Sequence, residues 1–119
     1  MSMTVTIAQL FAAVCLLENP KGIRGVHSDG VSYGVAGVTQ GALDDVNAFL
    51  KQPGYYTLGS MDDLKEAARV FELYTQIVCL RKHLPLTPEN RLRAWHPVGG
   101  TEEYVERVLN MVKEEVALW

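Results

Sequence analysis

Glu18 is the one carboxylate in the chain that lies in an apolar helical setting. It follows Leu16 and Leu17 and precedes Asn19-Pro20, a pair that ends a helix because proline disfavours helical dihedral angles in the preceding residue. The partial negative charge at a helix C-terminus and desolvation by leucines both disfavour an ionised carboxylate. A carboxylic acid that stays protonated can donate a proton to a leaving oxygen, so Glu18 is a candidate general acid. The residues alone also fit a simpler interpretation, a solvated glutamate at a frayed helix end.

Other groups of reactive residues lack the spacing that their chemistry requires. His27, Ser28 and Asp29 are adjacent, and neighbours on an extended chain point to opposite faces, so they cannot form a Ser-His-Asp relay. The three histidines, His27, His83 and His96, do not have the spacing of metal ligands. No phosphate-binding loop with its Lys-Ser/Thr ending is present. We therefore expect neither a metal nor a cofactor.

The elements that would position Glu18 are predicted from apolar spacing and capping residues. Helices are expected over residues 4–18, 41–51, 60–78, 87–95 and 101–116, with Ser60, Thr87 and Thr101 as N-caps for the last three. Residues 22–41 are rich in glycine, and their valines and Tyr33 are spaced mostly in twos, which predicts a small irregular β-hairpin. The expected fold class is α+β and predominantly α-helical.

Composition limits the kind of protein this is. The chain has 119 residues, of which 48% are hydrophobic, and this size and balance predict a single domain over residues 1–119. Eleven basic and 14 acidic residues without a run of like charge argue against nucleic-acid binding. No apolar stretch reaches the ~20 residues of a membrane span. The first basic residue, Lys21, follows the first apolar run, so we expect no secretory signal and synthesis in the cytoplasm.

The two cysteines, Cys15 and Cys79, both lie within apolar helical patterns. That position is typical of buried free thiols rather than of a disulfide scaffold or a metal site.

Four short motifs follow one another in the order typical of one known superfamily. They are Leu17-Glu18-Asn19, then Ala36-Gly37-Val38-Thr39-Gln40, then Ala94-Trp95-His96 with Gly99-Gly100, and last residues 101–108, Thr-Glu-Glu-Tyr-Val-Glu-Arg-Val. This order, over most of the chain, resembles the goose-type lysozyme and lytic transglycosylase superfamily. The stretch with Asp45-Val46-Asn47, then Tyr56-Thr57, then Met61-Asp62 before an alanine-rich helix is similar to the small phage-type branch of that family. In that family the first helix ends in the catalytic glutamate, and a Gly-Leu-Met-Gln-like motif follows a glycine-rich hairpin.

The resemblance implies a lysozyme-like fold and cleavage of peptidoglycan glycan strands at the cell wall. Glu18 would protonate the glycosidic oxygen between N-acetylmuramic acid and N-acetylglucosamine. Gln40 would hydrogen-bond the glycan, Tyr104 would hold the Glu18 carboxyl group, and Trp95 would stack on a sugar ring. His96, where the family has asparagine, would donate a hydrogen bond to the substrate. Each has a structural alternative: Gln40 as a polar residue at a helix start, Trp95 and Tyr104 as parts of the core.

Asp29 is the candidate second carboxylate. Hydrolysis requires a partner about 5–5.5 Å from the acid for a nucleophile, or about 6.5–9.5 Å for a base that activates water. Asp29 lies in the predicted hairpin turn, and an aspartate there usually hydrogen-bonds its own backbone. A lytic transglycosylase works with one carboxyl group because groups of the substrate assist, so the lack of a convincing second carboxylate favours that reaction.

Two departures from the family pattern motivate rival hypotheses. Asn19 stands where the family usually has serine, and His96 stands where it has asparagine. These changes fit a non-catalytic relative that binds glycan or takes part in assembly while keeping the fold. A third hypothesis is a helical protein-interaction domain in which the motif matches are accidental.

Overall fold

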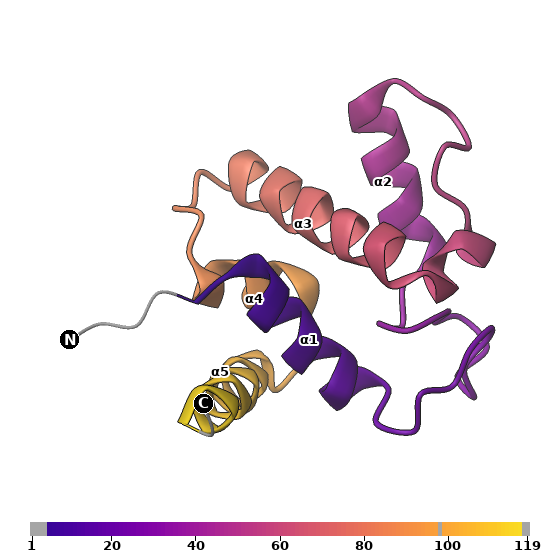
Figure 1. Ribbon diagram of the computed structural model, residues 1–119. Coiled ribbons are helices and arrows are strands. Elements are labelled where there is room, and N and C mark those ends of the chain that lie inside the picture. Colours follow the sequence, from indigo (N-terminus) through magenta and orange to yellow (C-terminus); the bar gives the residue numbers. More distant parts are fainter. Residues whose placement is uncertain (1–4, 98, 118–119) are drawn as a thin grey trace.

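In a computed structural model, the residues that the structure describes form five α-helices and one 3-10 helix (Figure 1). The structure describes residues 5–97 and 99–117, the last three of these as backbone only. In chain order the elements are α1 (Ile7–Glu18), α2 (Gln40–Leu50), η1 (Leu58–Asp62), α3 (Leu64–Arg81), α4 (Pro88–Trp95) and α5 (Thr101–Ala117). The prediction of a predominantly helical chain is confirmed.

Helix starts are set by local side-chain caps. Thr6 begins α1 with a capping box, in which its hydroxyl accepts from the Gln9 backbone N–H and the Gln9 side chain accepts from the Thr6 N–H. Thr39 caps α2, and Thr87 caps α4 with Pro88 in the first turn, as the sequence predicts for Thr87.

Ser60 is not the N-cap of the longest helix, contrary to the sequence prediction. Thr57 and Ser60 form a capping box around η1, and Asp63 caps α3 by accepting from the Glu66 backbone N–H. The 3-10 turn intervenes because it buries Met61 completely against the core. Leu64 is consequently the first residue of α3, and its side chain is 61% exposed.

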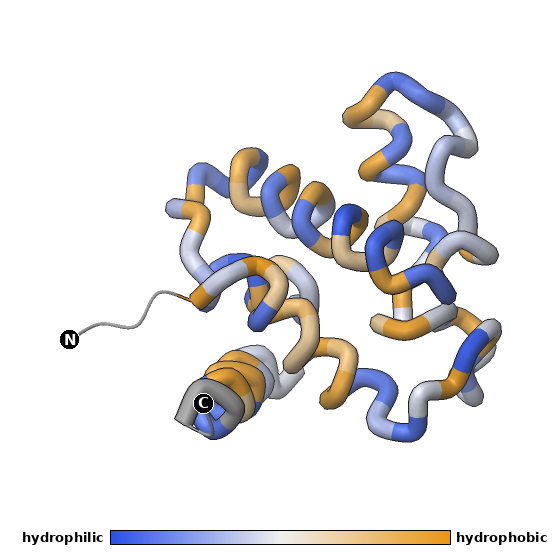
Figure 2. The backbone as a smooth tube through the Cα atoms, in the orientation of Figure 1, coloured by the Kyte–Doolittle hydropathy of each residue, from blue (hydrophilic) through white to orange (hydrophobic). Residues whose placement is uncertain are grey.

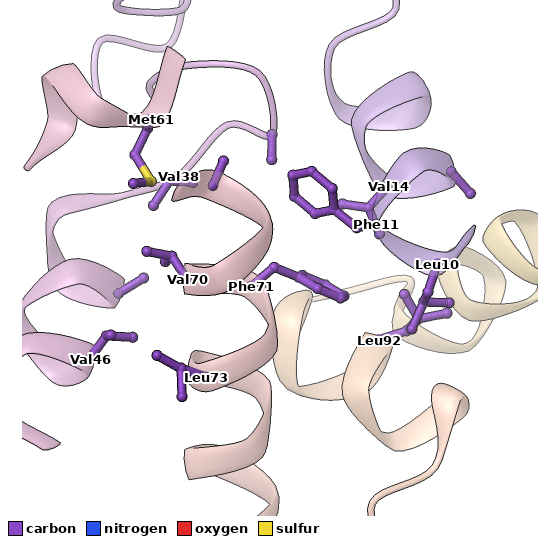
Figure 3. Close-up of a cluster of buried hydrophobic side chains, with 14 of the residues drawn as sticks. Leu10, Phe11, Val14, Val38, Val46, Met61, Val70, Phe71, Leu73 and Leu92 are labelled. Carbon is purple, nitrogen blue, oxygen red and sulfur yellow. The ribbon is translucent and has the colours of Figure 1, made fainter. Parts of the chain in front are cut away.

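The core surrounds α3, which contacts α1, α2, α4 and η1. Hydrophobic and hydrophilic positions alternate along the helices, so that each helix has an apolar face to bury (Figure 2). Phe71 is fully buried near the centre and points from α3 towards Phe11 and Val14 of α1 (Figure 3). Its ring lies 5.7 Å from the Phe11 ring and 5.1 Å from the Trp95 ring, measured between centroids. The core therefore joins the end of α4, where site residues are predicted, to α1.

The predicted β-hairpin is present only as two single-residue antiparallel bridges, Val26 with Tyr33 and Tyr33 with Val38. The glycine-rich loop, defined as residues 19–39, is held by backbone hydrogen bonds within it and by contacts with η1. The Gly25 N–H donates to Asp62 Oδ1 at 3.0 Å, and the Val35 N–H donates to the Met61 carbonyl at 3.1 Å. These contacts add to the backbone hydrogen bonds within the loop, where Tyr33 and Val38 donate to each other's carbonyl groups at 2.8 Å.

None of the helices that the structure describes is both long and apolar enough to cross a membrane.

Candidate functional site

A cleft of about 470 Å³ lies between the end of α1, the glycine-rich loop and the end of α4. We call it the Glu18 cleft. Its walls combine carboxyl, hydroxyl, imidazole and aromatic groups, and the residues that line it are Glu18, Asp29, Ser32, Gly37, Thr39, Ala42, Tyr74, Trp95, His96 and Pro97. Four of the six residues that the sequence singles out, Glu18, Asp29, Trp95 and His96, thus meet in one cavity.

Glu18 is the last residue of α1 and is half-buried at the cleft. The leucines before it do not enclose it together as expected, because Leu16 is 56% exposed and faces a different groove with Leu64. The enclosing groups come from elements distant in the sequence, Tyr104 of α5 and His96 at the end of α4.

Asn19 fixes the chain directly after Glu18. Its side chain is buried, accepts from the Ile23 backbone N–H at 2.8 Å and donates to the Ile23 carbonyl at 2.7 Å. The Asn19 backbone N–H donates to the Cys15 carbonyl at 2.8 Å, which completes the end of α1. Asn19 is therefore a structural clamp that joins the helix end to the glycine-rich loop.

Tyr104 lies beside Glu18 in the interior. Burial raises the pKa of the Tyr104 phenol strongly, and the nearby negative charge of Glu18 and its interaction with the phenol O–H raise it further. The hydroxyl oxygen is inaccessible to solvent, yet its geometry towards Glu18 and the other described groups does not complete a hydrogen bond. Tyr104 is thus a buried donor next to the candidate acid, and a small shift of the Glu18 carboxyl group would pair it.

His96 stacks on Tyr104 with ring centroids 4.3 Å apart and an angle of 10° between the planes. Its Nδ1 is also buried without a hydrogen-bond partner among the described groups. The His96 backbone is fixed on both sides, since its N–H donates to the Leu92 carbonyl and its carbonyl accepts from the Thr101 hydroxyl at 2.9 Å. The imidazole ring is therefore held between the cleft and the residue that touches Glu18.

Trp95 combines the structural and the functional roles that the sequence leaves open. Its ring packs edge-on against Phe71 and against Tyr74, at 5.1 and 5.9 Å between centroids. It is nevertheless only half-buried and lines the Glu18 cleft. One part of the indole anchors α4 to the core, and another part is available to a ligand.

Arg91 attaches α4 to α3, a role that the sequence did not reveal. Its guanidinium is largely buried and donates to the Glu72 carbonyl at 2.9 Å and to the Thr75 hydroxyl at 2.8 Å, both on α3. Burial lowers the pKa of this guanidinium, and the charge of Glu72 partly offsets that effect. The bonds fix α4 on α3 and thereby place Trp95 and His96.

Asp29 lies at the exposed rim of the cleft with its carboxylate engaged in a turn. Oδ1 accepts from the backbone N–H groups of Val31 and Ser32, and Oδ2 accepts from the Ser32 hydroxyl at 2.5 Å. These bonds, led by the one from the Ser32 hydroxyl, lower the pKa of Asp29 to about 2. The residue behaves as the turn aspartate that its sequence context describes.

Gln40 is not brought to the cleft. It is the first residue of α2, is exposed and donates from Nε2 to Asp44 Oδ1 at 2.8 Å, which is the arrangement of a polar residue at a helix start. Its neighbours Thr39 and Ala42 line the cleft in its place.

Sequence analysis missed Tyr74 and Ser32 as lining residues. Tyr74 belongs to the apolar stripe of α3, and only its position at the edge of that stripe could have indicated partial exposure. Ser32 has no distinguishing signal beyond its place three residues after Asp29.

Comparisons with protein-family models, with curated proteins and with solved structures found no match to this chain. Within the described residues, no three His, Cys, Asp or Glu side chains are grouped closely enough to hold a metal ion. The cysteines Cys15 and Cys79 are free thiols, and burial raises the pKa of Cys15 to about 12.

Proposed function

We propose that the chain has a lysozyme-like fold and cleaves the glycan strands of peptidoglycan, with Glu18 as the acid that protonates the glycosidic oxygen. The observation that carries the proposal is the Glu18 cleft, where a half-buried carboxyl group faces an aromatic wall and a rim of polar groups. A concave site with an aromatic surface and a few convergent polar groups suits a sugar chain.

The surroundings of Glu18 supply the groups that a general acid requires. Tyr104 is a buried hydroxyl donor beside the carboxyl group, and its own high pKa keeps it protonated at any physiological pH. It can therefore orient Glu18 without competing to lose its own proton. The half-exposed indole of Trp95 provides a flat apolar surface for a sugar ring.

The reaction that this site favours is transglycosylation rather than hydrolysis. Among the described residues that line the cleft, Asp29 is the carboxylate other than Glu18, and three hydrogen bonds within its turn hold both of its oxygens. A carboxylate committed to its turn is a poor nucleophile and a poor base for water. One carboxyl group can suffice when a substrate hydroxyl attacks and an anhydro sugar results.

The engagement of Asp29 in its turn also favours a second candidate, a non-catalytic protein that binds glycan. If Glu18 has no partner and His96 fills the space of the family's asparagine, sugar can bind without turnover. Both candidates use the Glu18 cleft to bind glycan, and they differ in whether the bound glycan strand is cleaved.

Mass spectrometry of fragments released from purified cell-wall sacculi separates the candidates. We expect the wild-type protein to release muropeptides with anhydro ends. Reducing ends would show hydrolysis and point to a second group that acts on water. Binding to sacculi without any released fragment would reject cleavage and support the glycan-binding candidate.

A further inference from the structure

A second hollow of about 240 Å³ adjoins the Glu18 cleft near the C-terminal end of α3. We call it the α3-end hollow, and the residues that matter for its chemistry are Asp45, Tyr74, Arg81, Lys82 and Pro97. Tyr74 and Pro97 line both spaces. The two spaces are therefore adjacent, and a ligand in the Glu18 cleft lies next to the hollow.

The α3-end hollow differs from the Glu18 cleft in charge. The cleft contains the carboxylates Glu18 and Asp29, whereas the hollow contains the cations Arg81 and Lys82 and one carboxylate, Asp45. Arg81 and Asp45 approach only to 3.9 Å, and both side chains are substantially exposed. Such a pair is weak, so the guanidinium keeps donors for another acceptor.

Lys82 adds a second positive charge beside Arg81. It directly follows α3, and within the described part of the chain its ammonium group has neither an ion pair nor a hydrogen bond. The charges in the hollow act on the Tyr74 phenol. Burial and the charge of Asp45 raise the pKa of this phenol, and the charge of Arg81 lowers it. The shared side chain is thus in electrostatic contact with the hollow.

We propose that the α3-end hollow binds a carboxylate-bearing substituent of the glycan that occupies the Glu18 cleft. In peptidoglycan this substituent is a peptide side chain with a free carboxylate, and the inference rests on the proposed function of the cleft. Arg81 holds the carboxylate by paired N–H donors and Lys82 adds a point charge. Because the whole chain carries a net charge of −3, attraction to an anionic ligand has to be local.

The test measures binding of two soluble peptidoglycan fragments by calorimetry at low ionic strength. One fragment carries peptides with free carboxylates, and the other is the same fragment with those carboxylates converted to amides. The protein is the Glu18→Gln variant, so that neither fragment is consumed. We expect tighter binding of the free-carboxylate fragment by about three- to tenfold, as two exposed ion pairs allow, and a smaller preference at high salt.

Two double variants in the same background locate the effect. Arg81→Gln/Lys82→Gln is expected to bind both fragments equally, with the affinity that the parent has for the amidated one. Lys65→Gln/Arg69→Gln removes the same charge from an exposed stretch of α3 outside the hollow and is expected to keep the preference.

Equal binding of the two fragments by the parent protein would contradict carboxylate binding in the α3-end hollow, but it would not contradict the proposed function. A preference that persists in Arg81→Gln/Lys82→Gln would also contradict carboxylate binding in the hollow. Binding of neither fragment would contradict the proposed function and the inference together.

Discussion

The Tyr104 hydroxyl oxygen, next to Glu18, and Nδ1 of His96, a residue that lines the cleft, are buried without hydrogen-bond partners in the described structure. An unsatisfied buried polar group costs about 1–3 kcal/mol of stability. The two rings stack on each other and so pack as one unit. Both have a role in the proposed reaction, in which Tyr104 holds the Glu18 carboxyl group and His96 donates to the glycan.

Replacing Tyr104 by phenylalanine separates its two roles. Tyr104→Phe should leave the free energy of unfolding unchanged or raise it by about 1 kcal/mol, because an unsatisfied hydroxyl is removed. Cleavage of sacculi should fall about tenfold, because Glu18 loses its nearby donor. Tyr55→Phe, at an exposed tyrosine, is the control for both measurements. A large loss of stability with unchanged cleavage would assign Tyr104 to the core alone.

The lowered pKa of Asp29 predicts that the stability of the fold depends on pH, independently of catalysis. Its pKa is about 2 in the folded chain against an ordinary value of 3.8, so its turn stabilises the fold fully above about pH 4. This contribution is lost as the pH falls from about 4 to about 2, where the folded carboxylate takes up its proton. The difference in melting temperature between wild type and Asp29→Asn should therefore shrink over that range, and cleavage at neutral pH should persist. A difference that stays constant down to pH 2 would contradict the turn bonds.

The elements that build the cleft are joined by side chains rather than by regular sheet. Asn19 joins α1 to the glycine-rich loop, and Arg91 joins α4 to α3. Gly34 brings the loop against η1: its φ is +78°, and a Cβ atom there would lie 2.3 Å from the Met61 carbonyl oxygen. The loop keeps its place because this position has no side chain.

A matched pair of glycine substitutions tests that close approach. Gly34→Ala combines a left-handed backbone with collision against the Met61 backbone, whereas Gly30→Ala has φ +75° and open space around the added atom. Gly30→Ala should cost about 1–2 kcal/mol in urea denaturation, and Gly34→Ala should cost distinctly more. Equal costs would mean that the loop does not pack on η1 as described.

Across the molecule, the helices and their order were predictable because apolar spacing and caps such as Thr87 act within a few residues. The start of α3 was not, since Asp63 rather than Ser60 caps it only once η1 buries Met61. Glu18, Trp95 and His96 could be found from short motifs. Tyr74 and Arg91 could not, because their roles depend on which helices meet. The hairpin was overpredicted, because alternation of apolar residues does not show that pairing stops at single bridges and that the loop then also bonds η1.

The centre of the core should dominate the stability of the whole chain. Phe71 is fully buried and contacts rings from α1 and α4, so Phe71→Ala should lower the free energy of unfolding by about 3–5 kcal/mol. Phe49→Ala, at a side chain that is 51% exposed, should cost less than about 1 kcal/mol. Circular dichroism during thermal denaturation measures both, and similar costs would contradict the described core.

The most direct test of Glu18 as the catalytic acid is the release of glycan fragments from sacculi by the wild-type protein, by Glu18→Gln and by Glu103→Gln. Glu103 is an exposed glutamate at the start of α5 and does not line the cleft, so its variant controls for the loss of one charge. We predict that the wild type and Glu103→Gln release fragments, and that Glu18→Gln releases at least about a hundredfold less, the lower end of what general acid catalysis contributes. Equal release by Glu18→Gln, or no release by the wild type where a known muramidase is active, would contradict cleavage of glycan strands with Glu18 as the acid.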